Sequence, residues 1–361
     1  MKLEEFYKNK RIIITGNTGF KGSWLTKLLL QSQAQVIGLA LEPPSQPNLF
    51  TILNLESQIY RFNHDIRDSE AVTRIFQQTQ PEIVFHLAAQ PLVRDSYEQP
   101  LFTWQTNLLG TVNVLEAIRK TPAVKAAVMI TTDKVYENKE WIWGYRENDE
   151  LGGYDPYSGS KAAAELAVKS YRRSFFNPND YLTKHQTLIA TARAGNVIGG
   201  GDWAKDRLVT DIVRSIFEKK EVITLRNPQA IRPWQFVLEP LLGYITLAKR
   251  LYEGEKAFAD AWNFAPDDSN FITVEELVKQ AIAISEQGSY QIQADPNKHE
   301  TNLLKLDAMK SKSQLGWRPR LDINETLNWT FDWYKNFYQN EEMQSSTSRQ
   351  ITEFLGLAGE T

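Results

Sequence analysis

Short apolar segments alternate with longer amphipathic segments in the first half of the chain, and this alternation constrains the fold more than any other feature. Buried strands are predicted at residues 11–15, 35–41, 82–88, 125–131 and 187–193. Helical spacing of apolar residues occurs at 20–33, 68–79, 100–120 and 154–176. This order predicts right-handed crossovers and a parallel sheet covered by helices on both faces. The predicted fold class is α/β, a doubly wound parallel sheet of the Rossmann type.

The regular alternation ends near residue 195. A chain of 361 residues exceeds the roughly 250–300 residues at which single cores stop growing, so we expect two lobes. Residues 1–194 plus 237–266 are assigned to the main domain, and residues 195–236 plus 267–335 to a smaller α/β lobe. The polar tail at 336–361 is predicted to be mobile.

Composition excludes several classes of protein. The net charge is −3 and lysine and arginine form no block, which argues against nucleic acid as a partner. The chain has no cysteine, and its charged N-terminus runs directly into the first strand. No stretch approaches 18 apolar residues, so no membrane segment is expected. We expect a cytoplasmic protein without a metal site.

The first strand is followed by a glycine-rich turn, G-x-x-G-x-x-G, with Gly16, Gly19 and Gly22. The first glycine permits the turn, the second allows a pyrophosphate to approach the backbone, and the third allows the helix to pack on the strand. Phosphates then bind at the helix N-terminus. A simple strand-to-helix turn is the alternative, but the position of this turn in an alternating α/β chain favours dinucleotide binding and makes the main domain a dinucleotide-binding domain.

Glu42 follows the second predicted strand and lies 26 residues after Gly16. A carboxylate there accepts hydrogen bonds from a ribose 2′-hydroxyl and repels a 2′-phosphate, which favours NAD over NADP. Lys21, beside the glycine turn, weakens this inference because its charge would tolerate the additional phosphate. The alternative for Glu42 is a solvated residue before the Pro-Pro turn.

Tyr157 and Lys161 are four residues apart on a predicted helix and therefore share one face. A tyrosine ordinarily has a pKa near 10, but a neighbouring ammonium group and a cationic nicotinamide ring both favour its phenolate. Tyr157 is therefore a candidate base for removing a hydroxyl proton while a hydride leaves the same carbon. The Y-x-x-x-K pattern alone is common, and a surface pair is the alternative.

Longer motifs extend this interpretation over residues 11–322: GNTGFKGSWL, AAQPLVRDSY, the stretch from TTDKVY through DPYSGSKAAAEL, RAGNVIGGGDWAKDRL, RPWQFVLEPL and LGWRPR. Together they resemble the extended short-chain dehydrogenase/reductases that act on nucleotide sugars. Within this family they are similar to the 4,6-dehydratase branch, including its tryptophan-rich insert EWIWGYRE. The resemblance implies bound NAD as cofactor and CDP-D-glucose as substrate, whereas nothing in the residues alone distinguishes the base.

The same resemblance implies a set of cofactor-binding residues beyond the glycine turn. HDIRD resembles the adenine-contacting loop, LAAQ the segment that lines the cofactor, and TNLLGT the next helix. The implied cofactor-binding residues are Gly16, Thr18, Gly19, Phe20, Glu42, Asp65, Ile66, Leu87, Ala88, Ala89, Gln90, Thr106, Thr131, Tyr157 and Lys161.

A dehydratase of this family oxidises C4 of the hexose, eliminates water across C5 and C6, and returns the hydride to C6. The implied catalytic residues are Thr132, Asp133, Lys134, Tyr157 and Lys161. Thr132 would hold the sugar hydroxyl and Asp133 would protonate the C6 oxygen. Related dehydratases have Thr-Asp-Glu where this chain has Thr-Asp-Lys. Lys134 would act at C5 if its pKa were lowered by about 3 units, or would position Asp133.

The diphosphate of the substrate requires arginines and backbone donors. The implied substrate-binding residues are Arg94, Ser96, Asn196, Arg207, Leu208, Arg232, Gln235 and His299. Arg94 and Ser96 would face the sugar or cap the following helix. Phe236 departs from the histidine expected after RPWQ, which puts a polar role at that position in doubt.

Two other functions fit parts of the sequence. A 4-epimerase, or a dehydratase specific for another nucleotide, would use the same tyrosine and lysine, but Asp133 and Lys134 favour dehydration. A redox-sensing binding protein would lose the tyrosine or the lysine, and both are present. Relatives pair through the helices predicted at 100–120 and 154–176, so a homodimer is expected.

Overall fold

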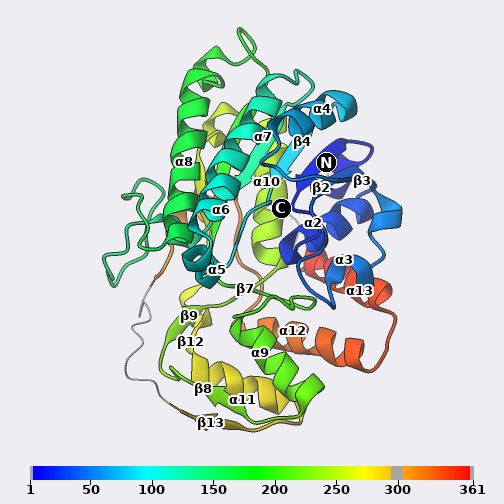
Figure 1. Ribbon diagram of the computed structural model, residues 1–361, viewed down its shortest axis with the longest axis vertical. Helices are drawn as coiled ribbons and strands as arrows, with labels where there is room; N and C mark the ends of the chain where they lie inside the picture. The colour runs from blue at the N-terminus through cyan, green and yellow to red at the C-terminus, as the bar shows by residue number, and fades with distance from the viewer. Residues whose placement is uncertain (1–2, 294–303, 358–361) are drawn as a thin grey trace.

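A seven-stranded parallel sheet forms the centre of the molecule (Figure 1). The computed structural model describes residues 3–293 and 304–357. The strands of this sheet, in spatial order, are β11 (Ala261–Phe264), β6 (Leu188–Ala194), β5 (Ala126–Ile130), β4 (Ile83–His86), β1 (Arg11–Thr15), β2 (Gln35–Ala40) and β3 (Tyr60–Asn63). The five predicted strands and the predicted doubly wound topology are confirmed.

Helices cover both faces of the sheet, because alternate side chains of each strand point to opposite faces. Ile13 and Val84 belong to one apolar cluster, together with residues of α4, α7 and α8. Ile12 and Phe85 belong to a second cluster with α2 and α10. The bounds of these helices are α2 (Phe20–Gln31), α4 (Ser69–Thr79), α7 (Gly110–Arg119), α8 (Pro156–Ser174) and α10 (Leu238–Tyr252).

The sheet changes its winding direction at β1. From β1 the chain proceeds outward through β2 to β3, then returns to the other side of β1 as β4 and proceeds through β5 to β6. Ligands of open α/β sheets bind beyond the carboxyl ends of the strands at such a switch point. The glycine turn follows β1 directly, which places it at this switch point.

The five predicted strands leave two of the seven: β11 lies in the segment 237–266 that was assigned to the main domain, whereas β3 was not predicted. Strand β3 (Tyr60–Asn63) pairs in parallel with β2, and each of its residues is exposed or half-buried. It forms the outer edge of the sheet. An edge strand of this kind lacks the continuous apolar run by which buried strands are predicted.

A group of smaller elements lies at the carboxyl edge of the sheet, at the lower end of Figure 1. Three two-stranded sheets occur here: β7 (Val197–Ile198) with β10 (Gln235–Phe236), β9 (Ile231–Pro233) with β12 (Phe271–Thr273), and β8 (Ile223–Leu225) with β13 (Tyr290–Ile292). The accompanying helices are α9 (Leu208–Val213), α11 (Val274–Ser285) and α12 (Ile323–Tyr338). None of the helices in the described ranges has the length and apolar composition needed to span a membrane.

The remaining short elements connect these layers. They are α1 (Leu3–Tyr7), α3 (Leu49–Ile52), α5 (Val93–Glu98), α6 (Pro100–Trp104), the π-helical turns η2 (Gln105–Leu109), η5 (Arg214–Lys219) and η8 (Ser311–Leu315), and the 3₁₀ turns η1 (Glu56–Gln58), η3 (Asp133–Val135), η4 (Pro178–Asp180), η6 (Lys256–Phe258) and η7 (Asp268–Asn270). Helices α6 and α7 are continuous through η2, which accounts for the single helix predicted at 100–120.

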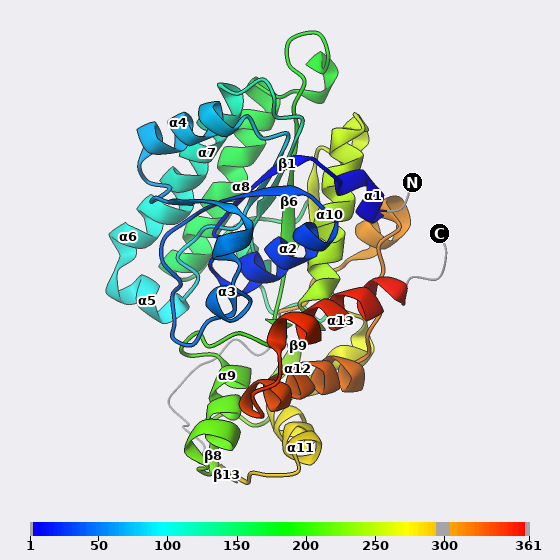
Figure 2. The same cartoon turned by 90° about the vertical axis from the view of Figure 1, so that its right-hand side faces the viewer.

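The C-terminal segment differs from the sequence prediction. Instead of a mobile tail from residue 336, the chain forms helix α13 (Met343–Gly356), which packs against α2 and α12 (Figure 2). Met343, Ile351 and Phe354 are buried on one face of α13. The polar composition of the segment obscured this spacing of apolar residues.

We predict that Phe354→Ala lowers the free energy of unfolding in urea by about 3 to 5 kcal/mol, as is usual for a buried aromatic side chain. Phe354 is fully buried, and its ring lies 6.3 Å from that of Phe236 and 6.4 Å from that of Trp329. Leu357→Ala, at an exposed position of the same segment, should change stability by less than about 0.5 kcal/mol. Equal effects of the two substitutions would show that α13 does not pack as described.

Candidate active site

The glycine turn after β1 is closely packed at its first and third glycines. Gly16 has φ +74°, and a Cβ there would lie 2.7 Å from the backbone nitrogen of Ala88. A Cβ on Gly22 would lie 2.1 Å from the carbonyl oxygen of Gly16. At Gly19, by contrast, the nearest atom to an added Cβ is 3.5 Å away. The first and third glycines are therefore required by the turn itself, whereas the second leaves open space beside the backbone.

Helix α2 begins directly after this turn, and no side chain caps it. Its N-cap residue is Gly19, which offers no side-chain acceptor for the amides of the first turn. The N-terminus of a helix attracts anions through these free amides and through the helix dipole. The turn and helix therefore fit the pyrophosphate of a dinucleotide.

The π-helical turn η2 provides a second indication of a bound ligand. The side-chain oxygen of Thr106, one of the predicted cofactor residues, is buried and makes no hydrogen bond within the described ranges. Buried polar groups rarely lack a partner, and π-turns occur frequently at functional sites. An acceptor or donor from a cofactor would satisfy this hydroxyl group.

The segment after β4 lies against the turn. Thr15 Oγ1 accepts a hydrogen bond from the amide of Ala88 at 3.2 Å, and Leu87 and Ala89 are half-buried. The side chain of Gln90 is directed inward and donates to Thr103 Oγ1 at 2.9 Å. Backbone groups of this segment, rather than the Gln90 side chain, are thus available to line a cofactor.

Two predicted cofactor residues lie in the glycine turn or at the start of the helix that follows it. Thr18 donates from its hydroxyl to the carbonyl of Leu41 at 3.0 Å, which joins the turn to the end of β2. Phe20 is half-buried near Gly199, whose added Cβ would lie 3.4 Å from the Phe20 ring. Residues 18 and 20 therefore hold the turn between β2 and the smaller elements.

Glu42 is exposed at the end of β2, as expected, but it already has partners. Its carboxylate pairs with Arg61 at 2.8 Å and accepts from Asn63 Nδ2 at 2.6 Å. Both partners belong to β3, the strand that the sequence did not predict. Arg61 also pairs with Glu56 at 2.5 Å. A ribose hydroxyl would therefore meet a carboxylate held in place by an arginine.

Asp65 and Ile66 follow β3. The carboxylate of Asp65 accepts from Arg67, with an Nη2–Oδ2 distance of 2.7 Å. Ile66 is buried against Gly110, where an added Cβ would lie 2.5 Å from Ile66 Cδ1. Asn113 donates to the Ile66 carbonyl at 2.9 Å. This loop is held by α7, with its backbone fixed at the edge of the predicted adenine site.

Helix α8 carries the tyrosine and the lysine. Its N-cap Asp155 accepts from the Ser158 amide at 2.9 Å, and Pro156 occupies the first helical position. Tyr157 and Lys161 are both buried. Burial raises the pKa of Tyr157 to about 12, while a hydrogen bond with Thr132 and the charge of Arg207 act in the opposite direction.

The ammonium group of Lys161 donates to the carbonyl of Ile130, at the end of β5, with a distance of 3.3 Å. Burial lowers the pKa of Lys161 to about 8, and the positive charge of Lys21 lowers it further, whereas Glu165 opposes the change. The lysine is thus bound to the strand that leads into Thr132, and this contact joins α8 to the catalytic segment.

Thr132 and Asp133 lie beside Tyr157. Thr132 Oγ1 donates to Asp133 Oδ1 at 2.8 Å, and an added Cβ on Gly195 would lie 2.9 Å from Asp133 Oδ2. Burial raises the pKa of Asp133, although Lys134, Thr132 and Lys21 oppose the change. A raised pKa is the property that a general acid needs near neutral pH.

The environments of two lysines differ from those expected from the sequence. Lys134 was expected to act as a base if it were buried, but its side chain is exposed. Lys21 lies toward the catalytic end of the turn: burial and the charge of Arg207 lower its pKa to about 8, whereas Asp133 and Asp202 raise it. The charges that act on Lys21 are those of Arg207, Asp133 and Asp202, not that of Glu42. The argument that Lys21 would tolerate the 2′-phosphate of NADP therefore loses its support.

Two of the predicted substrate-binding arginines, Arg207 and Arg94, already have ionic partners. Arg207, the N-cap residue of α9, pairs with Asp202 at 3.1 Å. Arg94 pairs with Asp206, which lies next to Arg207 in the chain. Ser96 is buried and donates to the carbonyl of Val93 at 2.6 Å, which satisfies its hydroxyl within α5.

The other predicted substrate residues surround β10. The carbonyl of Asn196 accepts from the Gln235 amide at 3.1 Å, and the Gln235 side chain donates to the carbonyl of Phe264 at 3.2 Å. Arg232 lies on β9 and donates to the carbonyl of Ile231 at 2.9 Å, and Leu208 begins α9. His299 lies outside the described residues.

Phe236 occupies the position where a histidine was expected, and its environment is apolar. It is fully buried, with ring centroids 6.0 Å from Trp24 and 5.5 Å from Trp329. The position therefore serves packing between α2 and α12 in this chain.

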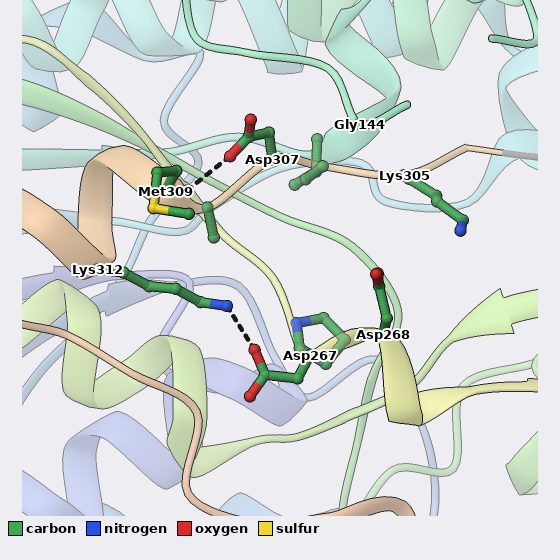
Figure 3. A pocket seen from close by; sticks show the side chains of 10 residues that line it. Gly144, Asp267, Asp268, Lys305, Asp307, Met309 and Lys312 are labelled. Atoms are coloured by element: carbon green, nitrogen blue, oxygen red, sulfur yellow. Dashed lines mark hydrogen bonds and ion pairs between the residues drawn. The ribbon is translucent and has the colours of Figure 1, made fainter. Parts of the chain in front are cut away.

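A separate cavity of about 240 Å³ lies among the smaller elements (Figure 3). Gly144, Lys305 and Asp307 are among the residues that line it, and Lys312 is directed toward Asp267. None of the predicted catalytic residues lines this cavity, so it is distinct from the site at the switch point.

Sequence reasoning missed a buried charged pair below the catalytic segment. Glu165 and Arg193 are almost completely buried and form an ion pair at 2.8 Å. Glu165 follows Lys161 by four residues, so its position on the same helix face was visible in the sequence. Its partner on β6 was not, because only the packing of α8 against β6 brings the two together.

Comparison with known proteins defines the class. The chain belongs to the GDP-mannose 4,6 dehydratase family, whose sequence profile matches residues 13–330. Over 353 residues it is 48% identical to a CDP-glucose 4,6-dehydratase of Salmonella typhimurium, with 98% of each chain covered.

Solved structures with the same fold are more distant in sequence. A dTDP-glucose 4,6-dehydratase from Streptomyces venezuelae, with NAD and TYD bound, has a TM-score of 0.76 at 21% identity and covers 92% of this chain and 99% of its own. A UDP-glucose 4-epimerase of Thermus thermophilus in complex with NAD has a TM-score of 0.76 at 24% identity, with 90% and 99% covered. These likenesses establish the fold.

We predict that Glu42→Gln reduces the preference for NAD over NADP by about tenfold or more, equivalent to about 1.4 kcal/mol. The substitution removes the charge that repels a 2′-phosphate and leaves Arg61 available to it. Titration calorimetry with both dinucleotides measures the ratio. The control is Glu56→Gln, which removes the other ion pair of Arg61 away from β2 and should leave the ratio unchanged. An unchanged ratio in Glu42→Gln would refute the assignment.

Proposed function

We propose that the protein is an NAD-dependent CDP-glucose 4,6-dehydratase, a lyase that converts CDP-D-glucose to CDP-4-dehydro-6-deoxy-D-glucose and water. The observation that carries the proposal is the placement of Tyr157, Thr132 and Asp133 in hydrogen-bonded or electrostatic contact. The substrate assignment is supported by the 48% identity with the Salmonella enzyme over nearly the full length of both chains.

The glycine turn, the uncapped N-terminus of α2, Thr106 and Glu42 would hold NAD. When bound, NAD accepts a hydride from C4 of the hexose and later returns it to C6, so that no net oxidant is consumed. The fit rests on the space beside Gly19 and on the hydroxyl of Thr106, which has no hydrogen-bond partner among residues 3–293 and 304–357. These residues would bind and orient the cofactor, and residues of α8 and of the segment that follows β5 would transfer the protons.

Tyr157 would remove the proton of the C4 hydroxyl. Burial raises the pKa of Tyr157, and so does the charge of Asp133, whereas the hydrogen bond with Thr132 and the charge of Arg207 favour the phenolate. Lys161, fixed to the Ile130 carbonyl, would contribute a positive charge near the phenolate and bind the ribose of the cofactor. Thr132 would hold the C4 hydroxyl against the tyrosine. Together these three residues account for the oxidation at C4.

Asp133 would supply the proton for the departing C6 hydroxyl group. The C4 ketone makes the C5 proton acidic, and its removal together with loss of the C6 oxygen as water requires both a base and an acid. Burial holds Asp133 toward its protonated form. Lys134 remains the proposed group at C5, or positions Asp133, and its exposed position means that bound substrate must supply the desolvation.

The smaller elements would bind the nucleotide. Arg207 and Arg232, with Asn196, would contact the diphosphate, and we propose that residues 195–236 plus 267–335 form this nucleotide-sugar lobe beside a dinucleotide-binding domain of residues 1–194 plus 237–266. In support, Arg207 acts electrostatically on both Tyr157 and Lys21. Arg207 is therefore close enough to Tyr157 and to the glycine turn to lie between the proposed nucleotide-sugar site and the proposed NAD site.

A homodimer is proposed on the basis of exposed apolar side chains. Leu101, Leu109 and Leu166 are more than half exposed, and they lie on α6, η2 and α8, which pack against one another. Pairing of these helices would form a four-helix interface. A mass near 41.5 kDa in light scattering, rather than twice that, would contradict the dimer. A cytoplasmic location is likewise a proposal, supported by the absence of cysteine.

We predict that the purified protein, incubated with CDP-, dTDP-, GDP- and UDP-hexoses with and without added NAD, forms a 4-keto-6-deoxy sugar from CDP-D-glucose. Such a product absorbs in alkali, whereas the product of a 4-epimerase does not. Turnover of another nucleotide sugar in preference to CDP-D-glucose would change the substrate assignment. Formation of an epimer without absorbance would replace the dehydratase by an epimerase.

Two variants separate the steps of the reaction. Tyr157→Phe should abolish oxidation and elimination together, and an active variant would show that Tyr157 is not the base. Asp133→Asn should preserve oxidation at C4 and slow the loss of water in rapid-quench experiments. If both steps survive intact in Asp133→Asn, the aspartate is not the acid.

A further inference from the structure

The buried pair of Glu165 and Arg193 contacts the segment 131–136, which carries the proposed catalytic residues. Arg193 donates from Nε to Glu165 Oε1 at 2.9 Å and from Nη2 to Glu165 Oε2 at 2.8 Å. Each carboxylate oxygen also accepts from a threonine: Oε1 from Thr131 at 2.5 Å and Oε2 from Thr191 at 2.8 Å. The carboxylate therefore accepts four hydrogen bonds, two from the arginine and one from each threonine.

These bonds determine the charge state of the pair. Burial alone would raise the pKa of Glu165, but the charge of Arg193 and the hydrogen bonds from Arg193, Thr131 and Thr191 bring it below its ordinary value. A buried ion pair is tolerated only when its remaining hydrogen-bonding capacity is satisfied, and it then fixes its surroundings firmly. The pair therefore holds its neighbours rigidly in place, and it need not increase the free energy of unfolding by itself.

The pair contacts both ends of the segment that carries the catalytic residues. Thr131, bound to Glu165, immediately precedes Thr132. At the other end Tyr136 accepts from Arg193 Nη1 at 2.7 Å and donates to Asn263 Oδ1 at 2.8 Å. Thr132, Asp133 and Lys134 lie between these two anchors, so the short 3₁₀ turn η3 is held at residues 131 and 136.

The same helix face supplies the other half of the site. Tyr157, Lys161 and Glu165 follow one another at intervals of four residues along α8, so their side chains share a face. A shift of α8 relative to β5 would move the tyrosine away from Thr132. The contact between Glu165 and Thr131 opposes this shift, one residue from the proposed catalytic threonine.

We propose that Glu165 and Arg193 are positioning residues, which hold the segment 131–136 in register with Tyr157 and so set the geometry between base and acid. The inference deepens the proposed dehydratase function and rests on it. It also assigns the Thr131 hydroxyl, expected from resemblance to contact the cofactor, to a hydrogen bond with Glu165. Thr131 acts through this bond on the placement of Thr132 and Asp133.

The chain offers a matched pair of substitutions for the test. Thr131→Val and Thr191→Val each remove one hydroxyl from the same carboxylate, at positions that are 6% and 1% exposed. Only Thr131 is joined to the catalytic segment, whereas Thr191 lies on β6. We expect Thr131→Val to lower kcat for CDP-D-glucose by about tenfold, since small displacements of reacting groups have large effects on rate. Thr191→Val should lower kcat by less than about threefold.

Three further measurements distinguish positioning from loss of folding or of binding. The two valine variants should show similar decreases in Tm, and KM for CDP-D-glucose and the Kd for NAD should change by less than about twofold in Thr131→Val. Thr131→Ser, which restores the hydroxyl, should return kcat to within about twofold of wild type. Tyr136→Phe, which frees the other end of the segment, should lower kcat with the same pattern.

Equal kcat values in Thr131→Val and Thr191→Val would overturn the proposal, as would a loss in Thr131→Val confined to the Kd for NAD, which would make Thr131 a cofactor contact. A decrease in Tm in Thr131→Val alone, with kcat restored at lower temperature, would reduce its role to stability and also overturn it. The wild-type enzyme is assayed in parallel: if it lacks dehydratase activity, the proposed function fails, and an active wild type with equal valine variants rejects the positioning role alone.

Discussion

The packing of helix α8 against the carboxyl ends of β5 and β6 is the constraint on which the site depends. The buried face of this helix is polar at three successive turns, through Tyr157, Lys161 and Glu165. Burial of such groups is costly unless each finds a partner. The partners are supplied by the segment that follows β5 and by β6, so the helix can dock in only one register. That register brings the tyrosine to Thr132 and Asp133.

The topology of the sheet brings the second half of the site to the same place. The glycine turn follows β1, and two strands away the segment with Thr132 follows β5; both lie at the carboxyl edge because all seven strands are parallel. Lys21, on the first turn of α2, shows how closely these parts approach, since its charge acts on Lys161 and Asp133. Charges at the glycine turn therefore influence the pKa values of groups in the proposed catalytic site.

Much of this arrangement could be predicted from the sequence, because it depends on local patterns. The buried strands, the glycine turn and the spacing of Tyr157 and Lys161 are short-range features. Strand β3 and helix α13 were missed because their pattern is weak and pairing or packing with distant segments stabilises them. The partnership of Glu165 with Arg193 depends on how α8 packs against β6, and the exposure of Lys134 depends on how the turn η3 sits against its neighbours. No local pattern encodes that information.

If one site both oxidises C4 and reduces C6 of the same hexose, a hydrogen isotope at C4 must move to C6. CDP-D-glucose carrying deuterium at C4 is converted by the enzyme, and the product is analysed by NMR and mass spectrometry. We predict that deuterium from C4 appears at C6 of the same molecule and that a solvent hydrogen enters at C5. Deuterium retained at C4, or lost to solvent, would contradict it.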